Sequence, residues 1–379
     1  MSGTVAAGTE DVRLERLRGF MEASDLDVVV TMSPENVAYV AGVTPPSQRI
    51  VRSRHAACIV PREGRTIFVA VRLEGPVVRA RSRLDEVELY EEFVEDPMDV
   101  VARALRDQGL GGSRIGVEAS FLPFADHGTL ARALDAGAEL VPVDADLARL
   151  RMVKGTAEID VIRRIGTAAE AIQGEVARAF GEGASEQEVA TFIAERYAEA
   201  GGDGLTMLAV GSGERSAILN APATRRRIGR GELVRVDIIG TSDCYYSDVA
   251  RTLVAGEPDD EQRRIYRLLY DVHRRLLEAI APSVLTSELY RLYHEEMVAA
   301  GLPPYHFVGH GLGVSLHEEP FVDALHSIPL EAGMILCIEP LTALDGRFGV
   351  QIEDEVLVTE DGCELLTEAG DDFLRMGQR

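Results

Sequence analysis

The sequence lacks several features that would identify common classes of protein. It has no tryptophan, and its four cysteines, Cys58, Cys244, Cys337 and Cys363, are scattered without short pairing. This spacing disfavours a disulfide framework or a cysteine-based zinc site, and it fits a reducing compartment. No apolar run reaches about 18 residues, and the N-terminus has no charged segment followed by an apolar one. We therefore expect a cytoplasmic protein that is neither exported nor inserted into a membrane.

Positive charge is also scarce. The chain has 39 Lys and Arg against 63 Asp and Glu, which gives a formal net charge of −24. Such a surface repels nucleic acid and anionic lipid, so we expect no partner of either kind. The excess of acid most simply keeps the protein soluble, but some of these acids can belong to a site.

The length of 379 residues exceeds what one ordinary core accommodates, so we expect two domains. In the first part, Val28–Thr31 has the pattern of a buried strand, and residues 55–71 predict two strands around an Arg-Glu-Gly turn. Helix and strand patterns alternate to about residue 148. Residues 1–150 therefore predict an α/β domain, and we find no catalytic cluster in them.

Residues 151–379 predict a second domain of the α+β class. Long helical patterns start at Thr156, and two capping boxes, Ser185 with Glu188 and Asp259 with Gln262, open further helices. A fourth helix is expected over about 287–299. Strand patterns lie between the helices, at 233–239, 245–254, 334–339 and 349–358. Helices that alternate irregularly with hairpins are typical of an α+β arrangement.

The first of these hairpins brings two acids together. A two-residue loop at Ser242-Asp243 would place Asp237 directly opposite Asp248. Like charges opposed across a strand pair destabilise a sheet, unless a divalent cation converts the repulsion into coordination. The hairpin therefore predicts a metal site.

The second hairpin repeats the arrangement. Asp345-Gly346 is a strong turn signal, and a loop over 345–347 pairs Leu344 with Phe348. The same register places Glu339 opposite Glu353. Four carboxylates with one imidazole suit manganese, cobalt, iron or zinc, and two such ions can activate water and polarise a carbonyl.

The imidazole comes from the segment FVGHGLGVSLHEEP, residues 307–320. It holds His310 and His317 among three glycines, and glycine favours close approach of the backbone.

The order Asp237, Asp248, His310, Glu339, Glu353 resembles the ligand set of the pita-bread metallopeptidase family. That family includes methionine aminopeptidases, Xaa-Pro aminopeptidases and prolidases. Residues 306–320 look like its His-rich segment, and "YYSDVART", residues 245–252, resembles the motif of its second metal aspartate. The first 150 residues resemble the N-terminal domain of the creatinase, prolidase and Xaa-Pro aminopeptidase branch. The resemblance implies a C-terminal pita-bread fold, residues 151–379, behind a smaller α/β domain, residues 1–150.

The resemblance also implies roles for these residues in binding two divalent ions, for which manganese is expected and cobalt, zinc or iron are alternatives. Asp237 would chelate one ion, Asp248 and Glu353 would bridge both, and His310 and Glu339 would bind the second. A hydroxide that bridges the ions would be the nucleophile, and Glu339 would handle its proton.

Two further histidines have implied roles toward the substrate. His317 would donate a hydrogen bond to the substrate carbonyl or the tetrahedral intermediate, and His306 would line the substrate pocket. The family usually dimerises, so a homodimer is expected.

Two positions depart from the peptidase pattern. Asn220 stands 17 residues before Asp237, where Xaa-Pro peptidases usually carry a substrate-contacting histidine, and Gln351 stands where many of them have arginine. Asn220 can hydrogen-bond a substrate, but it cannot become a cation. A neutral amide at Gln351 weakens recognition of a carboxylate there. The metal chemistry should survive both changes, whereas the identity of the substrate is put in question.

We therefore predict a dinuclear metal-dependent hydrolase that acts as a Xaa-Pro dipeptidase or aminopeptidase. The main alternative is a hydrolase or lyase of a small non-peptide metabolite, similar to creatinase or ectoine hydrolase, which Asn220 and Gln351 favour. A third hypothesis is an inactive binding module, which the presence of all five ligands and the negative charge disfavour.

Overall fold

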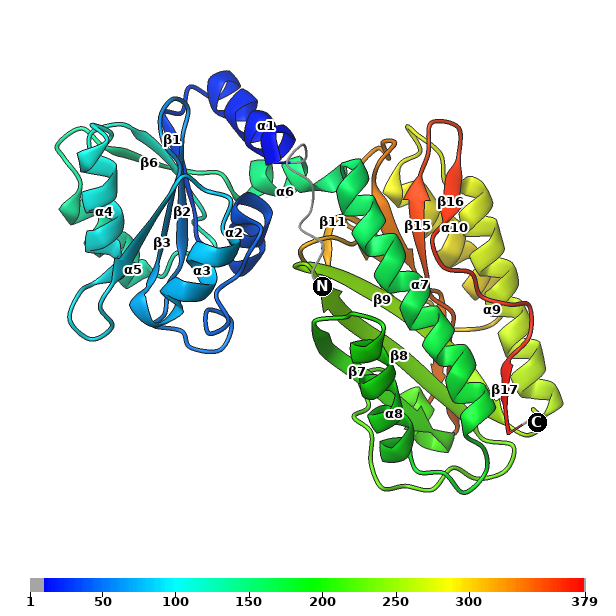
Figure 1. Ribbon diagram of the computed structural model, residues 1–379. Coiled ribbons are helices and arrows are strands. Elements are labelled where there is room, and N and C mark those ends of the chain that lie inside the picture. Colours follow the sequence, from blue (N-terminus) through cyan, green and yellow to red (C-terminus); the bar gives the residue numbers. More distant parts are fainter. Residues whose placement is uncertain (1–9, 378–379) are drawn as a thin grey trace. The chain divides into compact units, whose positions relative to one another are not determined.

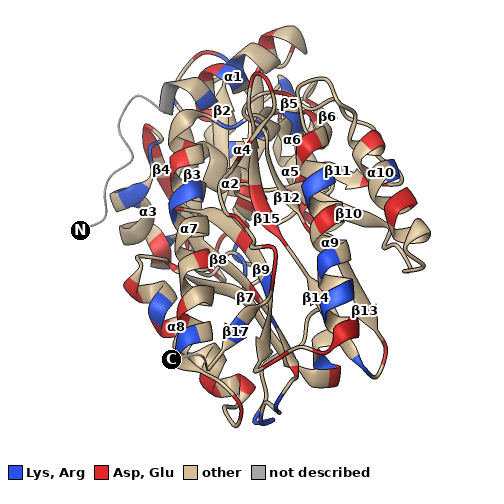
Figure 2. Cartoon of the chain, turned by 90° about the vertical axis from the view of Figure 1, so that its right-hand side faces the viewer, with Lys and Arg blue, Asp and Glu red and all other residues tan. Residues whose placement is uncertain are grey.

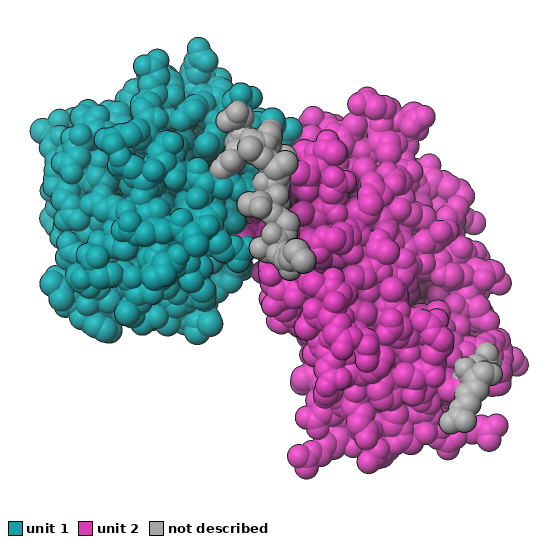
Figure 3. Space-filling view, viewed as in Figure 1, with its two compact units in different colours: residues 1–151 teal, residues 152–379 magenta. Residues whose placement is uncertain are grey.

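The computed structural model describes residues 10–377, and the chain divides into two compact units, residues 1–151 and 152–379 (Figure 3). Each unit has its own hydrophobic core. Among the described residues, no helix combines the length and the apolar character needed to cross a bilayer.

Unit 1 is built on a six-stranded mixed sheet with the order β4-β3-β2-β1-β5-β6. The strands are β1 Val28–Thr31, β2 Ala57–Pro61, β3 Ile67–Val71, β4 Glu86–Tyr90, β5 Arg114–Val117 and β6 Glu139–Pro142. Its helices are α1 Glu10–Ala23, α2 Pro34–Ala41, α3 Gly75–Arg81, α4 Pro97–Asp107, α5 Phe124–Ala133 and α6 Asp144–Met152, with a 3₁₀ turn η1 at Arg72–Glu74. The predicted strand at Val28–Thr31 and the hairpin within 55–71 are confirmed, and the α/β class follows from this sheet.

Unit 2 contains two helical hairpins, each packed on its own group of strands (Figure 1). The first hairpin is α7 Thr156–Ala179 and α8 Glu186–Glu199, and the second is α9 Asp260–Ala279 and α10 Thr286–Ala299. Helix α7 begins at the predicted residue, and both predicted capping boxes open α8 and α9.

The strands of unit 2 form three sheets. A four-stranded sheet has the order β17-β9-β8-β7, a five-stranded sheet has the order β11-β10-β12-β15-β16, and β13 pairs with β14. The strands are β7 Gly204–Ser212, β8 Leu233–Ser242, β9 Tyr245–Ala255, β10 Phe307–Gly311, β11 Glu318–Asp323, β12 Ile335–Ile338, β13 Leu341–Leu344, β14 Phe348–Gln351, β15 Asp354–Val358, β16 Cys363–Leu365 and β17 Leu374–Met376, with a 3₁₀ turn η2 at Gly213–Ala217.

Successive side chains of these strands alternate between a hydrophobic core packed against helices and the opposite face of the sheet. Val234, Val236 and Ile238 of β8 pack into the core made with α7 and α8. Leu336 and Ile338 of β12 pack into the core made with α9 and α10. Because successive side chains of a strand point to opposite faces, the intervening residues face away from the helices. Those intervening positions carry the acids of the candidate site.

The predicted register of the first hairpin is wrong by two residues. The turn is Asp243-Cys244, both with positive φ (49° and 71°), so Asp237 lies opposite Ala250 and Asp248 lies opposite Ile239. An even shift leaves both aspartates on one face of the sheet, where they are diagonal neighbours still within reach of each other.

The predicted register of the second hairpin is confirmed. Leu344 pairs with Phe348, and the same offset joins Ile338 to Asp354 in β12 and β15. Glu339 and Glu353 occupy the opposed positions between these two ladders.

Candidate metal centre

Five polar side chains of unit 2 converge in its interior, each from a different strand or strand end. They are Asp237 of β8, Asp248 of β9, His310 of β10, Glu339 after β12 and Glu353 before β15. None is more than 7% exposed. Burying this many acids in one place is unfavourable unless cations or hydrogen bonds compensate for the lost hydration.

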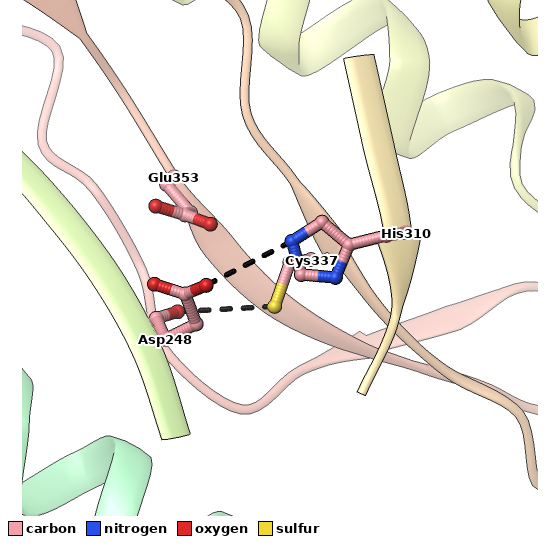
Figure 4. A group of neighbouring side chains, drawn as sticks. All are labelled: Asp248, His310, Cys337 and Glu353. Carbon is pink, nitrogen blue, oxygen red and sulfur yellow. Dashed lines mark hydrogen bonds and ion pairs between the residues drawn. The ribbon is translucent and has the colours of Figure 1, made fainter. Parts of the chain in front are cut away.

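His310 is oriented as a metal ligand would be. Its Nδ1 lies 3.0 Å from the carbonyl oxygen of Gly311, so Nδ1 carries the proton and Nε2 presents its lone pair. Nε2 lies 3.4 Å from Oε1 of Glu339 and 3.7 Å from Oδ2 of Asp248, and the latter contact is drawn in Figure 4.

Three buried atoms of this group have no hydrogen-bond partner within residues 10–377. They are Oδ1 of Asp237, Oδ1 of Asp248 and Nε2 of His310. Unpaired buried acceptors are rare in proteins, and acceptor atoms that converge in this way are what a divalent cation requires. The donor set of hard carboxylate oxygens and one imidazole therefore fits the metals expected from the sequence.

The carboxyl groups are strongly perturbed. Burial raises the pKa of Asp237 to about 6, although the guanidinium of Arg235 opposes the rise. Burial, with the neighbouring acids, also raises the pKa of Asp248 and of Glu353 well above the ordinary value. Such acids repel one another until a positive charge is placed among them.

Cys337 is a neighbour of the centre that the sequence analysis did not identify. Its Sγ and ligand atoms of Asp248, His310 and Glu353 all lie within 4.8 Å of one another (Figure 4). The thiol points toward the carbonyl oxygen of Asp248 at 3.9 Å, and burial raises its pKa well above the ordinary value.

Arg235 and Gln351 also lie at the centre. Their contacts bear on Gln351, which stands where many Xaa-Pro peptidases have arginine. Gln351 Nε2 donates to Oε2 of Glu339 and Oε2 of Glu353, both at 3.2 Å, and its Oε1 accepts from Nη1 of Arg235 at 2.6 Å. The amide therefore has a buried cation directly behind it. The sequence carried a signal for Arg235, because an arginine within the apolar strand "LVRVDII" can only be buried with a partner.

His317 stacks on His310, with ring centroids 3.7 Å apart and ring planes inclined by 16°. Although part of the His317 ring is exposed, desolvation of the rest lowers its pKa to about 4, with a further contribution from His310. His317 is thus neutral near pH 7 and can donate a hydrogen bond without a charge.

The loop that carries His317 is held by a buried ion pair. Lys154 Nζ lies 2.8 Å from Oε1 of Glu318, and the two side chains are 1% and 2% exposed. Close approach explains the glycines of this segment, as expected. A Cβ on Gly309 would meet the Cys337 carbonyl, and one on Gly311 would meet the Glu319 carbonyl.

The two predicted substrate contacts lie at the surface. His306 is exposed just before β10, and Asn220 is exposed in the turn that follows η2. Asn220 stands two residues after Ile218, whose carbonyl accepts a hydrogen bond from Arg235. This bond links the turn of Asn220 to the centre through the backbone.

Two further buried acids, Asp354 and Glu355, lie on β15 directly after Glu353; the acidic residues of β15 are red in Figure 2. Glu355 accepts a hydrogen bond from the backbone N–H of Asp248 at 2.9 Å, and burial raises its pKa to about 8. Asp354 accepts from Nη2 of Arg251 at 2.6 Å. These residues fix the backbone on which Asp248 and Glu353 are carried.

Comparison with known proteins gives the family. Residues 160–360 match metallopeptidase family M24, and residues 13–153 match the creatinase/prolidase N-terminal domain. A probable dipeptidase PepE of Mycobacterium tuberculosis is 34% identical over 318 residues, 82% of each chain. A Xaa-Pro dipeptidase of Pyrococcus furiosus is 29% identical over 96% of this chain and 99% of its own.

Solved structures agree with the sequence matches. The dipeptidase PepE of Mycobacterium ulcerans superposes with a TM-score of 0.82 at 30% identity, covering 96% of this chain and 97% of that one. The fold is thus a creatinase-type N-terminal domain followed by a pita-bread domain, as the resemblance implied. The chain belongs to metallopeptidase family M24.

Proposed function

We propose that this metallopeptidase is a Xaa-Pro dipeptidase whose two divalent ions are held by Asp237, Asp248, His310, Glu339 and Glu353. The observation that carries the proposal is the set of convergent, buried acceptor atoms on Asp237, Asp248 and His310 that have no hydrogen-bond partner among the described residues. The relatives named Xaa-Pro dipeptidase and prolidase support the choice of substrate.

Bound ions would supply an activated water and polarise the carbonyl of the bond before proline. Glu339, whose Oε1 faces His310 and whose Oε2 faces Gln351, would accept and return the proton. His317 would donate a hydrogen bond to the substrate oxygen where negative charge develops. His306 and Asn220 would contact the ends of the peptide.

The remaining features of the proposal rest on the composition and on the family. We assign residues 1–150 to the N-terminal domain and 151–379 to the catalytic domain. We expect manganese as the metal, with cobalt, zinc or iron as alternatives, a homodimer as the assembly, and the cytoplasm as the location.

A second candidate is a hydrolase of a small non-peptide metabolite on the same centre. Asn220 and Gln351 favour it, because neither can offer the positive charge that would pair with the carboxylate of a dipeptide. The two candidates share the metal chemistry and differ in the group that the pocket recognises.

The test is metal reconstitution followed by a substrate panel. After chelation, Mn²⁺ or Co²⁺ should restore cleavage of a Xaa-Pro dipeptide, and Asp248→Ala should abolish both metal binding and cleavage. The exposed Asp271→Ala, on α9, is the matched control and should retain both. If reconstituted protein cleaves ureido or cyclic amidine compounds and no Xaa-Pro peptide, the second candidate replaces the first.

A further inference from the structure

Arg235 is among the largest fully buried side chains of the described residues, at 1% exposed, and each of its nitrogens has a defined partner. Nε donates to the carbonyl oxygen of Ser216 at 3.2 Å, and Nη2 donates to that of Ile218 at 2.7 Å. Nη1 donates to Oε1 of Gln351 at 2.6 Å. A guanidinium held by three acceptors has little freedom to move, so its charge occupies a fixed place.

That place determines how the Gln351 amide is turned. A guanidinium offers only donors, so the amide must present its oxygen to Arg235. The amide nitrogen is then directed to the opposite side, where it donates to Glu339 and Glu353 at 3.2 Å each. Without Arg235 the amide could rotate by half a turn and bring its oxygen against the two carboxylates.

The charge of Arg235 also acts on the centre directly. Nη1 lies 3.6 Å from Oδ2 of Asp237, and the two side chains are 1% and 9% exposed. Attraction between opposite charges at this distance is strong in a poorly hydrated interior. Arg235 therefore contacts one proposed ligand and, through one amide, orients two others.

We propose that Arg235 and Gln351 form a positioning pair in which the guanidinium locks the amide, and the locked amide holds Glu339 and Glu353 in their metal-binding orientation. The proposal rests on the proposed function for the identity of the ligands. Arg235 is a positioning residue, since it acts on the proposed ligands, through Gln351 and at Asp237, and need not touch the substrate. Replacing Gln351 by arginine while Arg235 is present would weaken metal binding, because the two guanidinium groups would face and repel each other.

The experiment measures Mn²⁺ binding to the full chain by equilibrium dialysis, with thermal unfolding of the metal-free protein alongside. Gln351→Leu and Arg235→Met should each weaken binding by roughly 10- to 100-fold, the usual effect of losing a partner of a metal ligand. The double variant should bind about as weakly as Arg235→Met alone, because Arg235→Met already frees the amide of Gln351 and also removes the contact with Asp237. Gln351→Leu carries the test if Arg235→Met does not fold, because it keeps the bonds from Arg235 to Ser216 and Ile218.

Exchanging the two residues separates positioning from simple packing. Gln351→Arg alone should weaken Mn²⁺ binding, and the exchange Arg235→Gln with Gln351→Arg should recover part of it, since one guanidinium then faces the acids. Arg226→Met removes a paired arginine elsewhere in unit 2, where Arg226 binds Glu232 through two bonds of 2.6 Å. This control should lower thermal stability and leave Mn²⁺ affinity unchanged.

The results distinguish the inference from the proposed function. Variants that bind Mn²⁺ as the wild type does, or strictly additive losses, would overturn the positioning pair. A wild type that binds Mn²⁺ but cleaves no Xaa-Pro peptide would overturn the choice of substrate alone. A wild type that binds neither Mn²⁺ nor Co²⁺ in the same dialysis would overturn both.

Discussion

At the scale of single residues, the centre is defined as much by atoms that lack a hydrogen-bond partner in the described part of the chain as by atoms that have one. Nδ1 of His310 donates a hydrogen bond to the Gly311 carbonyl oxygen, and Nε2 faces Asp248 and Glu339. The resemblance in order and spacing predicted that the five proposed ligands lie together, and their side chains do converge in unit 2. Arg235 was not predicted, because its partner Gln351 is 116 residues away and no local pattern joins the two.

His317 provides the prediction at this scale. His317→Ala should lower kcat roughly 100-fold, the loss expected when one donor to a developing charge is removed. The Mn²⁺ content should not change, since His317 stacks on a proposed ligand and is not one itself. Steady-state kinetics and metal analysis of the same sample check both statements.

The control for this prediction is His326→Ala. His326 is 41% exposed and pairs with Asp323 at 2.7 Å, outside the centre. It should keep both kcat and metal content. Loss of metal from His317→Ala would show instead that its ring supports His310 as a ligand.

At the scale of elements, the sequence predicted which segments form helices and strands better than it predicted how one hairpin is aligned. Capping boxes and an Asp-Gly turn carry strong local signals, and those predictions are confirmed. The turn Asp243-Cys244 contains no glycine, although both residues have positive φ. Because this turn carries no signal in the sequence, the predicted strand register was wrong by two residues. The two aspartates still lie on one face of the sheet, because the shift is even.

The two helical hairpins of unit 2 allow a matched prediction on backbone strain. Gly183 and Ser283 occupy equivalent turns, with φ of 87° and 71°, and their N–H groups donate to Ile228 and Leu330. A side chain in this conformation costs about 1 kcal/mol, which glycine avoids. Ser283→Gly should therefore raise the free energy of unfolding, and Gly183→Ser should lower it by a similar amount.

Denaturant unfolding of the two variants measures these changes directly. A Cβ on Gly183 meets no atom of residues 10–377 within 4 Å, so crowding by the described part of the chain does not complicate the comparison. Stabilisation by Gly183→Ser would contradict the argument from backbone conformation.

At the scale of the whole molecule, the sequence predicted two bodies, their classes and an acidic surface, because length, periodicity and charge are properties of long stretches. The sequence did not predict the buried network of polar contacts around Asp354, next to the centre. Asp354 gathers Arg251, Thr367 and the backbone of Ala369 from distant parts of unit 2. Folding alone brings such residues together, so their function could not be inferred from spacing.

One member of this network makes stability depend on pH. His273 on α9 is 1% exposed, and burial lowers its pKa to about 4. Asp354 at 3.5 Å opposes this fall, and the positive charges of Arg251 and Arg274 add to it. In the unfolded chain its pKa is about 6.5. Between pH 6.5 and 4, His273 is therefore protonated in the unfolded state and neutral in the folded state. The free energy of unfolding should fall as the pH drops through this range.

His273→Leu should remove that part of the acid sensitivity. Between pH 7.5 and 4.5 the variant should lose roughly 2 to 3 kcal/mol less unfolding free energy than the wild type. Unfolding at equal metal content measures the difference, and His294→Leu, at an exposed site on α10, is the control. Parallel pH profiles for His273→Leu and wild type would refute the assignment.

The ammonium that holds the loop of His317 belongs to Lys154, two residues before α7 starts. Anyone cutting the gene to express the catalytic half alone would naturally begin at the helix, and would thereby delete this counter-charge. Removing one partner of a buried pair destabilises a protein by about 3 to 5 kcal/mol. A usable truncation must therefore retain the short stretch 152–155, which looks like a mere linker but is needed by the loop that carries His317.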